Sequence, residues 1–124
     1  MSESAEYIRH KKEIIAIILR KDFSKNGANF FTIPDDPFQF GVLQYEKGQD
    51  IPAHKHLRAE RKIDLVCEVL FVQSGKIEVI FYDENNQRAD SRVISEGDII
   101  YLKKMGHGFK LLEDSKIIEI SKKY

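Results

Sequence analysis

Residues 68–82 read EVLFVQSGKIEVIFY, and this stretch carries the strongest indication of the fold class. Val66 to Val72 is almost entirely apolar, whereas Lys76 to Tyr82 alternates polar and apolar residues before it becomes apolar. Gln73-Ser74-Gly75 separates the two runs, and glycine suits a tight turn because it tolerates positive φ. The pattern predicts two β-strands joined by a hairpin turn.

The same rhythm of short apolar runs and turn residues continues on both sides of this hairpin. Further strands are expected at residues 38–45, 92–95, 99–102, 108–112 and 116–120. Strands that recur at roughly ten-residue spacing are typical of an all-β sandwich or barrel rather than of a βαβ fold. We therefore expect an all-β protein with little helix.

One N-terminal run leaves two alternatives open. Ile14 to Leu19 is rich in β-branched residues, which favour strands because rotation about χ1 is restricted. The alternative is a helix from Ala5 to Arg20, in which four isoleucines roughly share one face. We favour the strand.

The composition limits the class of protein. The chain has 124 residues, which fits one domain, and 42% apolar with 32% charged residues indicates a globular fold. Lys+Arg and Asp+Glu number 20 each, so no global field attracts nucleic acid or an anionic membrane. Cys67 is the only cysteine, which excludes an intrachain disulfide and a thiolate zinc site. With no apolar run of membrane-spanning length, we expect a cytoplasmic protein without nucleic-acid or membrane partners.

Four residues are candidate metal ligands. His54 and His56 lie one residue apart in GQDIPAHKH, and on a strand they would point to the same face. Glu68 opens an apolar strand, where a carboxylate is costly to bury unless it is paired or metal-bound, and His107 lies between two glycines. Imidazole and carboxylate together suit Fe, Mn, Ni, Zn or Cu. The alternatives are exposed loop histidines, a salt-bridged Glu68 and a hydrogen-bonded His107.

These residues make the sequence similar to the cupin superfamily, whose fold is a double-stranded β-helix or jelly roll. The first cupin motif, G-x5-H-x-H-x3–4-E-x6-G, matches Gly48, His54 and His56 and, after eleven intervening residues where the motif allows three or four, Glu68 and Gly75. Glu60 stands at the uninterrupted spacing, but the glycine due after it would fall on Cys67, so Glu68 is preferred.

The second cupin motif, G-x5-P-x-G-x2-H-x3-N, matches more weakly. Gly97 fits its start, and His107 comes one residue earlier than the pattern places the histidine. Lys103, Met105 and Leu111 stand where the motif has proline, glycine and asparagine. The two motifs together cover residues 48–107.

The resemblance implies a single cupin domain over residues 1–124 that holds one divalent metal ion through His54, His56, Glu68 and His107. It implies a small polar ligand such as a sugar derivative, and an isomerase-like or epimerase-like activity. A non-catalytic metal-dependent binding module and an Fe(II) dioxygenase are the alternatives, and no catalytic residue is assigned.

Two further expectations concern partners of the domain. Arg58, Arg61 and Tyr101 are candidate substrate contacts, although the two arginines are otherwise ordinary solvated residues. A homodimer is expected, with strands from residues 5–45 at its interface and Ile14 to Leu19 extending the sheet of the partner.

Overall fold

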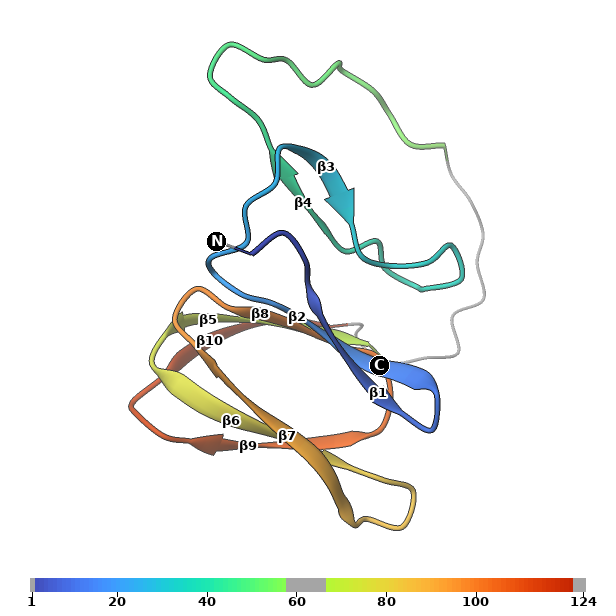
Figure 1. Cartoon of the computed structure of the whole chain (residues 1–124), viewed down its shortest axis with the longest axis vertical. Helices are drawn as coiled ribbons and strands as arrows, with labels where there is room; N and C mark the ends of the chain where they lie inside the picture. The colour runs from blue at the N-terminus through green and yellow to red at the C-terminus, as the bar shows by residue number, and fades with distance from the viewer. Residues whose placement is uncertain (1, 58–66, 122–124) are drawn as a thin grey trace.

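The structure is a computed structural model that describes residues 2–57 and 67–121. These residues form ten β-strands and no helix, which confirms the predicted all-β class (Figure 1). The strands are β1 (Glu6–His10), β2 (Glu13–Leu19), β3 (Gly27–Phe30), β4 (Gly41–Gln44), β5 (Glu68–Ser74), β6 (Lys76–Tyr82), β7 (Arg88–Ser95), β8 (Ile99–Leu102), β9 (Gly106–Leu111) and β10 (Lys116–Ser121).

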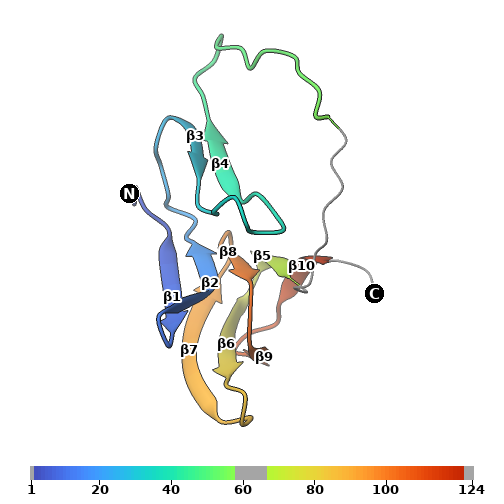
Figure 2. The same ribbon diagram turned by 90° about the vertical axis from the view of Figure 1, so that its right-hand side faces the viewer.

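The strands are arranged in three antiparallel sheets. A five-stranded sheet has the order β1-β2-β8-β5-β10, a three-stranded sheet has the order β7-β6-β9, and β3 pairs with β4 alone. The two larger sheets face each other as the layers of a sandwich, and the β3-β4 pair lies on the outer side of the five-stranded sheet (Figures 1 and 2). Over the described ranges, none of the sheets closes into a barrel.

The main hydrophobic core lies between the two facing sheets. Ile77, Val79 and Phe81 of β6 are fully buried and alternate with half-buried residues, as expected for a strand with one face on a core. Leu70 and Val72 of β5 meet them from the opposite sheet. The alternation in β6 therefore reports which face of this strand points inward.

A second core lies between the five-stranded sheet and the β3-β4 layer. Its buried members are Ile17, Leu19, Phe40, Cys67 and Tyr101. Because β2 contributes to both cores, residues 15–19 are all buried, and the strand appears as a continuous apolar run. This confirms the strand over the helix.

The position of β2 differs from the one expected in a dimer. β1 pairs with one edge of β2 and β8 with the other, so both edges of this strand are occupied within the chain. The edge strands of the five-stranded sheet are β1 and β10. In this arrangement β2 is central and is not free to extend the sheet of a partner.

The strand boundaries agree best where the apolar pattern is strongest. β6 and β8 coincide with the predicted ranges, and β9 and β10 differ from theirs by one or two residues at their ends. β5 extends two residues beyond its predicted end, and Val66 at its predicted start lies outside the described residues. β7 begins four residues before its predicted start, whereas β4 is shorter than predicted because Phe38 and Phe40 pack on Tyr101 outside any strand. β1 and β3 were not predicted.

Candidate functional site

Glu68 and His107 meet between the two facing sheets. Glu68 is the first residue of β5, two residues before the inward-facing Leu70. His107 lies on β9 opposite Phe81, which is fully buried in the main core. The Nε2 atom of His107 is 3.3 Å from Oε2 of Glu68, and the two side chains are 26% and 18% exposed. Two of the four predicted metal ligands are thus in contact, although they come from opposite layers.

The turn between β8 and β9 sets the direction of His107. Met105 in this turn has a φ of 73°, an unusual value for a bulky residue, and its side chain packs against the main core. The amide nitrogens of Lys103 and Lys104 donate to the carbonyl of Ile15, which fixes the start of the turn. Met105 stands where the second cupin motif has a glycine. The backbone at this position has the positive φ that glycine would accommodate, although the residue is methionine.

His54 and His56 form a second pair on the loop between β4 and β5. Both are exposed, and their ring centroids are 5.2 Å apart with an interplanar angle of 79°. Nδ1 of His54 donates to the carbonyl oxygen of Pro52 at 2.9 Å, because a carbonyl only accepts. This leaves Nε2 of His54 as the nitrogen with a lone pair for a ligand. The two histidines lie in a loop and not in the strand that was expected.

The four predicted ligands are therefore arranged as two pairs. In residues 2–57 and 67–121 there is no group of three or more His, Cys, Asp and Glu side chains placed to hold a metal ion. Arg58, Glu60 and Arg61 lie outside the described residues, so their predicted roles are neither supported nor opposed. A single centre made of all four ligands stays a prediction.

Tyr101 lies in the second core. It is fully buried, and its ring stacks on Phe40 at a centroid distance of 5.8 Å. Burial raises the pKa of Tyr101, and the neighbouring Cys67 thiol raises it further. Its hydroxyl has no hydrogen-bond partner among the residues that the structure describes. In this position the ring presents no open surface to a substrate, and its predicted contact stays untested.

A buried ion pair was not anticipated from the sequence. Nζ of Lys103 is 2.5 Å from Oδ1 of Asp36, and the two side chains are 9% and 5% exposed. The other oxygen of Asp36 accepts a hydrogen bond from the amide of Ile33 at 3.0 Å. The ion pair therefore connects the loop between β3 and β4 to the residue that follows β8. No local sequence pattern around Asp36 or Lys103 predicts this contact.

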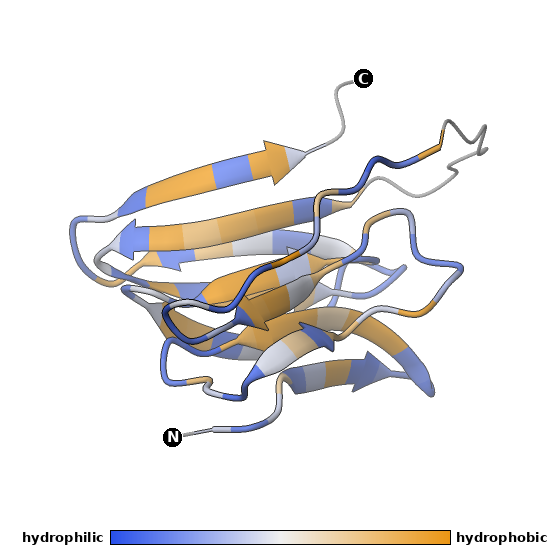
Figure 3. Cartoon of the chain, turned by 90° about the horizontal axis from the view of Figure 1, so that it is seen from above, coloured by the Kyte–Doolittle hydropathy of each residue, from blue (hydrophilic) through white to orange (hydrophobic). Residues whose placement is uncertain are grey.

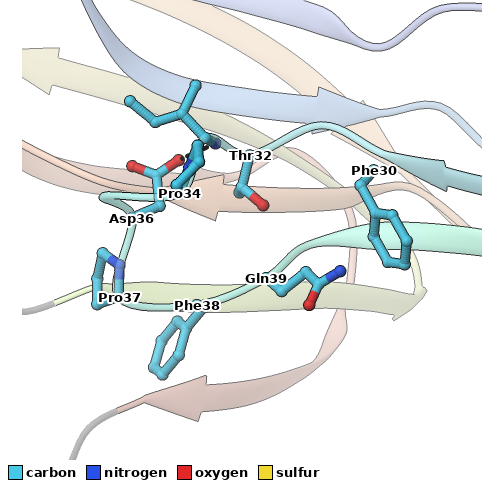
Figure 4. A pocket seen from close by; sticks show the side chains of 8 residues that line it. Phe30, Thr32, Pro34, Asp36, Pro37, Phe38 and Gln39 are labelled. Atoms are coloured by element: carbon cyan, nitrogen blue, oxygen red, sulfur yellow. Dashed lines mark hydrogen bonds between the residues drawn. The ribbon is translucent and has the colours of Figure 1, made fainter. Parts of the chain in front are cut away.

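The loop between β3 and β4 encloses an open hollow of about 420 Å³. Among the described residues, those that line it lie between Phe30 and Gln39, and Figure 4 shows their side chains on both arms of the loop. The carboxylate of Asp36 and the hydroxyl of Thr32 in this wall are already engaged, with Lys103 and with the amide of Phe40. None of the four predicted metal ligands lines the hollow.

These features define an all-β protein with two facing sheets, an added two-stranded layer and a glutamate–histidine pair between the layers. Comparison with known proteins gives no match to a family model, to a curated protein or to a solved structure. No helix in the described part of the chain is long and apolar enough to cross a membrane.

Proposed function

We propose that this chain is a small metal-binding protein of the cupin type, in which His54, His56, Glu68 and His107 hold one divalent metal ion. The contact between Glu68 and His107 is the observation that carries this proposal. Both residues were selected from the sequence for their ligand chemistry, and they come together from opposite layers of the fold.

The chemistry of the donor set fits the proposed ion. One carboxylate and three imidazoles suit Zn²⁺, Mn²⁺, Ni²⁺, Fe²⁺ or Cu²⁺ and leave coordination positions for water or a ligand. Glu68 and His107 are partly buried, so a cation between them would be shielded from bulk water. The proposal requires His54 and His56 to approach this pair, since protein ligands lie about 2.0–2.2 Å from such ions.

The fold belongs to the same proposal. A jelly roll is built from two antiparallel sheets that face each other across one core, and the two larger sheets have this arrangement. A double-stranded β-helix further requires the segment between β4 and β5 to join the walls of the barrel. The glycine turn at Gly75, which the first cupin motif contains, adds support because its φ is 96°.

The proposed activity follows from a metal ion with open positions. When bound, such an ion polarises a carbonyl or hydroxyl group of a small polar ligand. The four proposed ligands would bind the ion, and the partial burial of Glu68 and His107 would limit access of water to it. An isomerase-like or epimerase-like reaction on a sugar derivative is the activity that we propose.

Metal loading tests the site directly. The purified protein is incubated with Zn²⁺, Ni²⁺, Mn²⁺ or anaerobic Fe²⁺, desalted and examined by elemental analysis. We expect one equivalent of at least one metal, and a loss of it in Glu68→Gln, His107→Ala and the His54→Ala/His56→Ala double variant. His10→Ala is the matched control, because His10 is the remaining histidine of the chain and lies on β1.

Two outcomes would overturn the metal site. One is a wild-type protein that retains no metal after loading, and the other is full retention by the variants at the four proposed positions. If a metal is bound, incubation with sugar phosphates separates the activities. Product formation supports the isomerase, ligand-induced thermal stabilisation without product supports a binding module, and oxygen uptake with Fe²⁺ supports a dioxygenase.

A further inference from the structure

On the outer face of β5 and β10, apolar side chains are left partly exposed by the residues that the structure describes. Val69 and Phe71 point outward from β5, since they alternate with the buried Leu70 and Val72. Ile120 and Ile118 are their cross-strand partners on β10, and these isoleucines are 64% and 45% exposed. Elsewhere on this side of the sheet, the β3-β4 layer and its loop cover the outward residues of β2 and β8. Val69 packs against the margin of this second core, so within residues 2–57 and 67–121 the least covered part of the outer face is formed by Ile118 and Ile120.

β10 is also an edge strand. Its only neighbour in the sheet is β5, so the other edge of its backbone has no strand beside it among the described residues. Figure 3 shows β10 at the margin of the molecule, with apolar residues along most of its length. An exposed apolar edge strand is a template for pairing with another strand.

The size of the apolar face indicates how a partner has to bind. Ile118 and Ile120 together expose about the surface of one isoleucine side chain. This is far less than the roughly 800 Å² per partner that a stable interface buries. A partner that covers only this face is therefore not held firmly, and the strand edge has to contribute hydrogen bonds as well. A second copy of the chain provides an identical edge and an identical face at once.

The charges on β10 favour one self-pairing. In an antiparallel pair centred on Ile118, this residue lies opposite Ile118 of the second copy, and Lys116 lies opposite Ile120. Glu119 then lies opposite Ile117, so no like charges face each other. A pairing centred on Glu119 would instead place two carboxylates opposite each other, which is unfavourable. The formal net charge of zero adds no long-range repulsion between copies.

We propose that β10 forms the interface of a homodimer, in which it pairs antiparallel with β10 of a second copy about a two-fold axis at Ile118. The two five-stranded sheets then continue into one sheet, and the outward isoleucines of both copies form one apolar cluster. This inference does not depend on metal binding.

Disulfide cross-linking tests the pairing and its register. Residues directly opposite each other have Cβ atoms about 4.5–5.5 Å apart, so Ile118→Cys in two copies forms a disulfide under mild oxidation. Ile120→Cys is the matched control, since its two copies are offset by four residues, or about 13 Å. Cys67 is buried and does not compete. Cross-linking of Ile120→Cys as fast as Ile118→Cys, or of neither variant, would overturn the proposal.

Light scattering after size exclusion tests the interface without a cross-link. We expect the wild-type protein to shift from monomer to dimer between tens and several hundred micromolar. Ile118→Lys should weaken dimerisation about tenfold or more. Leu43→Lys is the control, because Leu43 is 56% exposed on β4, away from β10. A wild-type protein that remains monomeric throughout this range, or an unchanged dimer of Ile118→Lys, would contradict the inference.

Discussion

Replacing Gly75 with alanine should destabilise the fold by about 1 kcal/mol more than the same change at Gly27. The two glycines have nearly equal φ values of 96° and 97°, so both alanines incur the same backbone strain. This strain is about 1–2 kcal/mol for an L-residue in the left-handed region. The environments differ, because a Cβ at Gly27 meets no atom within 4 Å, whereas a Cβ at Gly75 overlaps the carbonyl oxygen of Asp114 and the side chain of Ser115.

The overlap at Gly75 adds a second contribution. Relieving it requires the segment at Ser115 to move, which breaks the hydrogen bond from the amide of Lys76 to the Ser115 hydroxyl, at 3.1 Å. A buried or half-buried hydrogen bond contributes about 1 kcal/mol. We therefore expect Gly75→Ala to lower the free energy of unfolding by about 2–3 kcal/mol, and Gly27→Ala by about 1–2 kcal/mol.

Urea-induced unfolding measures both values. The chain has no tryptophan, so far-UV circular dichroism is the appropriate signal. The comparison is valid if both variants retain the wild-type dependence on urea concentration, since this slope reports the surface exposed on unfolding. Equal destabilisation by the two substitutions would refute the reasoning, because it would mean that the space around Gly75 does not matter.

Three further predictions concern buried and paired polar groups. Tyr101→Phe should raise the free energy of unfolding by about 1 kcal/mol, because it removes a buried hydroxyl without a partner in the described residues. Since the pKa of Tyr101 is raised, the folded state retains this proton longer than the unfolded state, so stability should fall as pH rises above about 10. The Phe variant should show a shallower fall in unfolding experiments between neutral and alkaline pH. Lys103→Met should lower the free energy of unfolding, measured with urea, by about 3–5 kcal/mol because it leaves the carboxylate of Asp36 buried without its lysine. The double variant Lys103→Met/Asp36→Asn should recover part of this loss. Burial opposes ionisation of Glu6, but hydrogen bonds from two arginines outweigh burial and lower its pKa. The folded state therefore holds this proton less tightly than the unfolded state, and the free energy of unfolding should fall as pH drops below about 4. The fall should be smaller in Glu6→Gln. An unchanged pH dependence in the Phe or Gln variant, or a stable Lys103→Met protein, would contradict the respective argument.

The strands that the sequence predicts well are those whose own residues determine the burial pattern. β6 alternates because one of its faces lies on the main core, and its predicted limits are the observed ones. β3, with the sequence GANF, has only four residues, and its apolar residues Ala28 and Phe30 lie on its exposed face, so its pattern carries little indication of a strand that pairs with β4. β4 is shorter than predicted, since the aromatic rings just before it pack on Tyr101. Local pattern fails where a distant contact decides the conformation.

The same distinction applies to the site. Glu68 and His107 were selected because they match residue types of the two cupin motifs, although the spacing departs from each motif, and they do contact each other. Asp36 and Lys103 form a closer and more deeply buried pair, yet nothing in the sequence around either residue indicates a partner. A contact between residues far apart in the sequence can be predicted from the sequence only when both residues belong to a known motif. The relation between the Glu68–His107 pair and His54 depends on the path of the connecting loop, which no motif specifies.

The two proposals use opposite faces of one strand. Side chains alternate along β5, so Glu68 points inward with Leu70, whereas Val69 and Phe71 point outward toward the side chains of Ile120 and Ile118 on β10. A substitution on the outer face therefore removes interface contacts without touching the glutamate–histidine pair. Ile118→Lys should leave metal retention unchanged, and Glu68→Gln should leave dimerisation unchanged. Loss of both properties in either variant would instead indicate that β5 and β10 have unfolded, because contacts on the two faces of an intact strand are separate.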